Sequence, residues 1–132
     1  MIRTGLARVG ACVLAIMLGA NEVSAACLKA NTDDQAAQGR LKYIAITNEA
    51  YARTEHAYIL ELRAPACLDG VDDYDKVETT KRIHVFAMEK PLLAQLHRLV
   101  GKNVIVRGNP FGEHTAHHHA PIVMRITKID RL

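Results

Sequence analysis

The prediction of the fold starts from Leu99-Val100-Gly101-Lys102-Asn103-Val104-Ile105-Val106-Arg107-Gly108, in a chain of 132 residues. Over residues 91–100, Leu93, Leu96 and Val100 recur at spacings of three and four and predict the buried face of a helix. Pro91 suits its first turn, and Gly101 is a natural stop. An apolar run with strand character follows at residues 103–108. The stretch therefore predicts a helix that ends at a glycine and leads directly into a strand.

Four further segments have the period-two pattern of strands, at residues 39–47, 57–63, 82–88 and 121–129. The resulting order of three strands, one helix and two strands is that of the OB barrel, and the quoted stretch resembles the passage from helix to strand four in many OB-fold proteins. We predict a mainly β protein, a small five-stranded OB-like barrel with its helix between strands three and four. An SH3-like barrel and a small sandwich are the alternatives.

The first residues have the pattern of a secretory signal peptide. Arg3 and Arg8 precede an uncharged apolar run at residues 9–20, and Val23-Ser24-Ala25 supplies small residues for cleavage. We predict a signal peptide over residues 1–25 and one barrel domain over 26–132, in a periplasmic or secreted protein. Cleavage after Ala26 fits equally well, acylation of Cys27 is a further alternative, and no membrane span is expected in the mature chain.

Two cysteines, Cys27 and Cys67, remain after the predicted cleavage. In an exported protein such a pair favours a structural disulfide. The alternative of a metal or redox pair lacks the Cys-x-x-Cys spacing. A net charge of +3, no Trp, two Phe and four Tyr provide neither the cationic groove nor the stacking rings of a nucleic-acid partner.

Four of the seven histidines lie within six consecutive positions, His114 to His119. If this segment is extended, His117 and His119 share one face and are candidate ligands for Zn or Cu, with His114 as a third. Glu113, His84 and His56 are other possible third ligands. The alternative is a structural cluster in which a buried, hydrogen-bonded His118 rigidifies the loop.

In the predicted barrel this segment connects the last two strands, a loop that often borders the ligand surface of OB folds. The candidate ligand-binding residues are therefore Phe111, His114, His117, His118 and His119. The alternative for Phe111 is that it covers one end of the barrel.

The same segment resembles an exported bacterial family of unknown function whose members carry Thr-(Gly/Ala)-His-His-His-x-Pro. Here the motif corresponds to Thr115, Ala116, His117–His119 and Pro121. Residues 104–108 and the pair Cys67-Leu68 also fit that family. The resemblance implies membership and no activity.

No catalytic residues are predicted. The chain has no Gly-x-Ser-x-Gly elbow, phosphate-binding glycine loop or His-Glu-x-x-His helix. The acidic loop at residues 64–81 lacks the ligand spacing of an EF-hand and is predicted to be a solvated hairpin loop. We therefore expect a non-enzymatic binding module for an envelope protein or small ligand. The alternatives are a metal-binding protein and a metal-dependent hydrolase, in which Glu113 beside His114 serves a metal-bound water.

Overall fold

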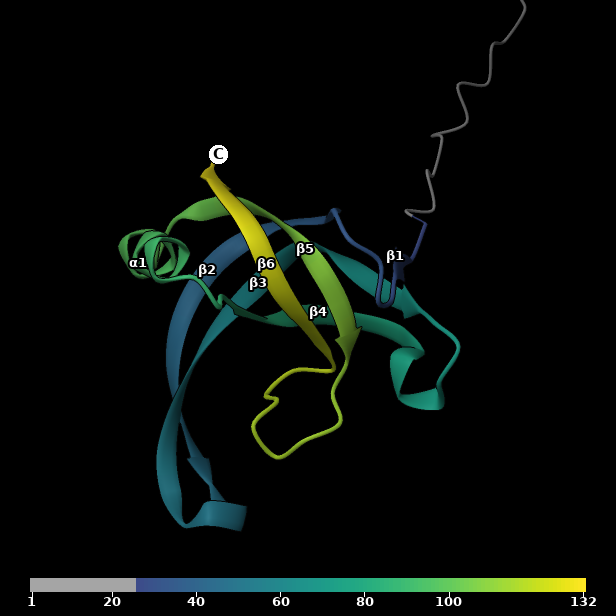
Figure 1. Cartoon of the computed structure of the whole chain (residues 1–132), viewed down its shortest axis with the longest axis horizontal. Helices are drawn as coiled ribbons and strands as arrows, with labels where there is room; N and C mark the ends of the chain where they lie inside the picture. Colours follow the sequence, from purple (N-terminus) through teal and green to yellow (C-terminus); the bar gives the residue numbers. More distant parts are fainter. Residues whose placement is uncertain (1–25) are drawn as a thin grey trace, which may run out of the picture.

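The computed structural model describes residues 26–132, and the predicted signal peptide lies outside the described residues. Six strands, one α-helix and two short 3-10 helices follow one another along this part of the chain (Figure 1). Their order and bounds are β1 (Leu28–Lys29), β2 (Gln35–Asn48), η1 (Glu49–Tyr51), β3 (Arg53–Asp69), η2 (Asp73–Asp75), β4 (Val77–Phe86), α1 (Lys90–Arg98), β5 (Asn103–Gly112) and β6 (Ile122–Arg131).

Five of the strands close into a barrel. The sheet runs β3-β2-β5-β6-β4, and pairing of β4 with β3 closes the ring. The β4–β6 pair is parallel, whereas the other pairs in the ring are antiparallel. The predicted mainly β fold and small five-stranded barrel are confirmed.

The predicted place of the helix within the strand order is wrong. Helix α1 lies between the fourth and fifth strands of the chain, not between the third and fourth. The difference comes from β1, a two-residue strand that pairs in parallel with the end of β3. Two residues are too few to produce a periodic pattern, so the sequence did not predict this strand.

The core fills the barrel, and α1 covers part of it. Leu92 and Leu96, four positions apart, are the buried residues of the helix, whereas Leu93 is exposed. The helix is therefore rotated relative to the face expected from its sequence. It packs mainly against β6. The largest fully buried side chains of the barrel are Leu41, Leu60, Ile83, Ile122, Met124 and Ile126.

The β2–β3 hairpin continues to a tip at η1, and its ladder runs unbroken from Gly39–Leu62 to Asn48–Arg53. Towards the tip, a second small apolar cluster forms around Ala57, Ile59 and Ala120. Ala120 belongs to the loop between β5 and β6, so this cluster packs the loop against the hairpin. Figure 1 shows the loop in yellow-green beside the hairpin.

The acidic connection between β3 and β4 is fastened to the barrel by one buried carboxylate. The Asp75 side chain is fully buried and accepts hydrogen bonds from the Gly112 N–H at 2.8 Å and from the Asn31 side chain at 3.0 Å. A side chain at position 112 would collide with the carbonyl oxygen of Tyr74, so this close approach requires glycine. Asp75 thereby holds the end of β5, where the histidine segment begins.

The predicted disulfide is confirmed. Cys27 and Cys67 are bonded and join the start of the described chain to β3. Disulfides persist in oxidising compartments, so the bond suggests an extracytoplasmic location. Among residues 26–132, no helix has both the length and the apolar character that crossing a membrane requires.

Candidate functional site

The histidine segment forms a turn and not an extended strand. His118 N–H donates to the Thr115 carbonyl at 3.1 Å, and β6 begins only at Ile122. The Asn48 side chain at the hairpin tip donates to the Ala116 carbonyl at 2.9 Å, which holds the turn against the hairpin. The alternation of faces that an extended segment would have does not apply here. We call residues 113–121 the histidine loop.

One carboxylate from the hairpin joins two of the predicted residues. Glu55 Oε1 lies 2.7 Å from His117 Nδ1, and Glu55 Oε2 lies 3.0 Å from His119 Nε2. His117 and His119 thus do point the same way, although the cause is the turn and not a strand face. Sequence reasoning missed Glu55, because it is more than sixty positions from both histidines and has no motif around it.

The pKa of Glu55 is set by opposing effects. Burial of the carboxyl group raises this pKa, because the charged form loses contact with water. Hydrogen bonds from the side chains of Asn48, His119 and His117, and then the charge of His117, act in the opposite direction and prevail. They lower the pKa of Glu55 from 4.5 to about 2. The carboxylate therefore stays ionised at any neutral or mildly acidic pH.

We expect the Glu55 carboxyl carbon to titrate with a midpoint near pH 2 by nuclear magnetic resonance, and not near its ordinary 4.5. Because the folded-state pKa is lowered, the contact stabilises the fold above about pH 4.5, and this contribution is lost as the pH falls through about 2. In Glu55→Gln, amide exchange within the histidine loop should accelerate roughly tenfold.

The matched control is Glu61→Gln. Glu61 lies on the same strand in an exposed ion pair with Lys42, at 2.8 Å, and its substitution should leave loop exchange unchanged. A midpoint near 4.5 for Glu55, or equal exchange in the two variants, would contradict the bridging role.

Beneath His119, His84 of β4 supports the loop from the outer face of the barrel. Its Nδ1 accepts the His119 backbone N–H at 3.2 Å, and the two rings stack with centroids 5.6 Å apart. Burial, followed by the charges of His119 and His118, lowers the pKa of His84 to about 4 against an opposing effect of Glu55. His84 is therefore neutral at physiological pH and serves as an acceptor.

The His118 ring lies in an aromatic group with Phe111 and His114. Its Nδ1 accepts the His114 backbone N–H at 3.1 Å, and its ring meets Phe111 edge-on at 5.3 Å. The ring of His114 donates from Nδ1 to the Gly112 carbonyl at 2.9 Å. Burial and the neighbouring histidines lower the pKa of His118. This part of the cluster matches the structural alternative, since its rings stabilise the loop.

The outward side of the histidine loop forms a small exposed surface with the hairpin tip. The Tyr51 ring stacks on the His117 ring with centroids 4.6 Å apart and an interplanar angle of 14°. The Arg53 guanidinium carbon lies 5.5 Å from the centre of the Tyr51 ring. Tyr51 remains 53% exposed, and the His117 side chain 47%. We call Tyr51, Arg53 and His117 the tip surface.

Sequence reasoning missed Tyr51 and Arg53. The only signal for them is a short polar turn between two strands, and such a turn does not show which other loop it contacts. In the OB barrel, the connections equivalent to the β2–β3 hairpin and the β5–β6 loop flank the ligand surface. Here these two connections meet directly.

The donor atoms of the cluster are arranged for hydrogen bonding. His117 Nδ1 and His119 Nε2 are both hydrogen-bonded to the Glu55 carboxylate. Within residues 26–132, no three His, Cys, Asp or Glu side chains are grouped so that they could hold a metal ion. The rings of His114 and His117 lie on different sides of the loop, one against Phe111 and one against Tyr51. This arrangement favours neither the metal-binding nor the metal-dependent hydrolase alternative.

Comparison with known proteins adds one family. Residues 82–130 match the model of a domain of unknown function, DUF4431. The matched segment begins in β4 and includes α1, β5, the histidine loop and most of β6. Among curated proteins, none matches the chain. A family of unknown function agrees with the expectation from the sequence and assigns no chemistry to the site.

Proposed function

We propose that this chain is an exported bacterial protein, periplasmic or secreted, whose signal peptide is residues 1–25 and whose barrel is a non-enzymatic binding module. It belongs, on this proposal, to the family with the Thr-(Gly/Ala)-His-His-His-x-Pro motif. The single observation that carries the binding role is the tip surface, where Tyr51 and His117 stack in the open beside Arg53. The partner is an envelope protein or small ligand that presents an aromatic or anionic group.

The residue types of the tip surface support this proposal. Tyrosine and arginine are enriched at the energetically important positions of interfaces, because each offers a large contact area together with polar groups. Arg53 Nε lies 3.6 Å from Glu55 Oε1, and its side chain is 63% exposed, so the guanidinium can also attract an anionic group. The Tyr51 and His117 rings stack on each other and both stay about half exposed, so each still presents surface to a partner.

The fixed geometry of the surface is a second argument. Glu55 holds the His117 ring at 2.7 Å, and the Asn48 side chain holds the loop backbone at 2.9 Å. Binding to a surface that is already ordered loses less conformational entropy than binding to a mobile loop. The half-buried part of the cluster, His84, His118 and His119, then serves the exposed part by positioning it.

We expect a photoreactive phenylalanine analogue in place of Tyr51 to form a specific cross-linked adduct in cells that produce the protein. Mass spectrometry of the adduct identifies the partner. In the Glu55→Gln background the yield should fall roughly tenfold, because His117 is no longer held in position. The matched control is the same analogue in place of Tyr43, which is 45% exposed against 53% for Tyr51 and lies outside the tip surface. Equal adducts at both positions, or none at position 51, would argue against the proposal.

A further inference from the structure

A cavity of about 250 Å³ opens between β2 and β3, near the end of β3 that is distant from Glu55. The ladder between the two strands ends at Gly39 and Leu62. A side chain at position 39 would collide with the carbonyl oxygen of Glu61, so the two backbones are in close contact at this point. Beyond it they part. In the described part of the chain, residues 63–65 of β3 pair with no neighbouring strand.

The floor of this cavity is the hydrophobic core. Leu62 is buried in the main cluster, and Leu28, Ala37 and Ala66 pack against it. Alanine at positions 37 and 66 leaves space that a larger side chain would fill, and Cys67 of the disulfide closes one wall. Water in such a cavity has few polar partners, so an apolar group would displace it favourably.

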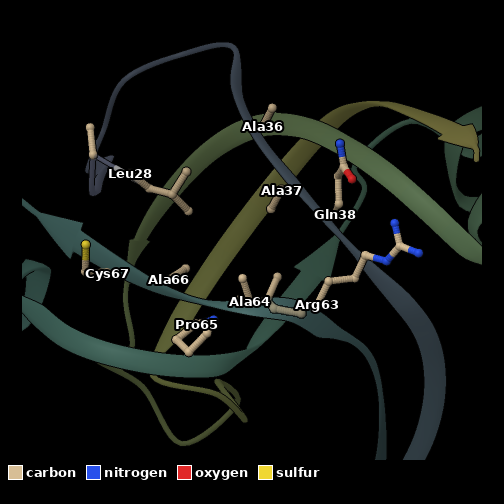
Figure 2. Close-up of a pocket in the computed structure, with 11 residues that line it drawn as sticks. Leu28, Ala36, Ala37, Gln38, Arg63, Ala64, Pro65, Ala66 and Cys67 are labelled. Carbon is tan, nitrogen blue, oxygen red and sulfur yellow. The ribbon is translucent and has the colours of Figure 1, made fainter. Parts of the chain in front are cut away.

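The two sides of the cavity differ in chemistry. Figure 2 shows Leu28 and Cys67 on one side and the side chains of Arg63 and Gln38 together on the other. Arg63 is exposed, and none of its contacts within residues 26–132 is an ion pair. A guanidinium offers parallel N–H donors that match the two oxygens of a carboxylate. The cavity is thus apolar at one end and cationic at its rim.

We propose that this cavity binds a short aliphatic carboxylate, with its tail against Leu28 and Leu62 and its head group on Arg63. The volume is slightly below the roughly 300 Å³ at which ligand pockets usually begin, which favours a medium-length chain over a long one. This inference concerns a different surface from the tip surface and does not rest on the function proposed for it.

The test is calorimetric titration of the purified protein with butanoate, hexanoate and octanoate, together with octanol as a ligand of the same length without charge. Affinity should rise about fourfold for each added methylene, because each one buries further apolar surface. Octanol should bind roughly tenfold more weakly than octanoate, because it lacks the charge-assisted hydrogen bonds to Arg63. Octanoate should shift the amide resonances of Ala37 and Leu62.

Two variants separate the tail from the head group. Ala64→Leu, at an exposed position in the cavity lining, should abolish binding of both ligands by filling the space. Arg63→Gln should remove the difference between octanoate and octanol, whereas Arg125→Gln, at an exposed position on β6, should behave as the unchanged protein. Thermal melts verify that each variant is folded. Octanoate that does not bind, that binds equally in Ala64→Leu, or that binds no better than octanol would overturn the proposal.

Discussion

Reduction of the Cys27–Cys67 disulfide is expected to lower the free energy of unfolding by about 4 kcal/mol and the melting temperature by roughly 20 °C. The bond joins positions 40 residues apart. In the chain-entropy model, the closed loop restricts the unfolded chain and so raises its free energy. A barrel of this size has a total stability of only about 5–15 kcal/mol, so this loss is a large fraction of it.

Thermal unfolding followed by circular dichroism, with and without reductant, measures this effect. The double variant Cys27→Ser/Cys67→Ser should melt at the temperature of the reduced protein and be insensitive to reductant. An unchanged melting temperature on reduction, with free thiols verified chemically, would show that the bond does not stabilise the barrel. The β1–β3 pairing of Leu28 with Leu68 lies next to the bond and should be the first contact to weaken.

Asp75→Ala should destabilise the protein by about 3 kcal/mol, a fall in melting temperature of roughly 15 °C. The substitution removes a fully buried carboxylate that accepts hydrogen bonds from the Gly112 N–H and the Asn31 side chain. Both donors would lose their partner, and the buried Gly112 N–H has no access to water in compensation. The end of β5 and the start of the histidine loop should then become more mobile.

Asp73→Ala is the matched control, because Asp73 lies in the same short helix η2 and is exposed. It should change the free energy of unfolding by no more than about 0.5 kcal/mol. Chemical denaturation of both variants measures the difference, and amide exchange at Gly112 locates it. A similar small effect for both variants would mean that the Asp75 contacts contribute little to stability.

Much of the fold could be predicted from local patterns in the sequence. The alternating segments predicted all five barrel strands, and the helical spacing followed by Gly101 predicted α1. Their ends were predicted less well: β3 extends to Asp69, because its outer part pairs with β1 and with β4 after a register shift. The rotation of α1, which buries Leu92 and exposes Leu93, depends on where β6 lies.

The candidate site was predicted only in part. The sequence singled out His117 and His119, and the structure does bring them together. It could not identify Glu55, which bridges them, or Tyr51, which stacks on His117. The shared face of His117 and His119 was inferred only for the case of an extended segment, and a turn occurs there instead; a run of polar residues has no period that distinguishes the two. The third partner of His117 and His119 was expected to be His114, Glu113, His84 or His56, whereas the residue that contacts both is Glu55 of the hairpin.

The sequence alone determines the type of each element, because periodicity acts over a few neighbouring positions. The order of the elements indicates a barrel, and the presence of just two cysteines after the predicted cleavage indicates their pairing. The orientation of the histidine rings and the cavity beside Arg63 follow from contacts between strands that are distant in the chain. Closure of the barrel places the β2–β3 hairpin against the β5–β6 loop. The separation of β2 from β3 beyond Gly39 opens the cavity. Such contacts depend on register and on side-chain packing, which no local pattern encodes.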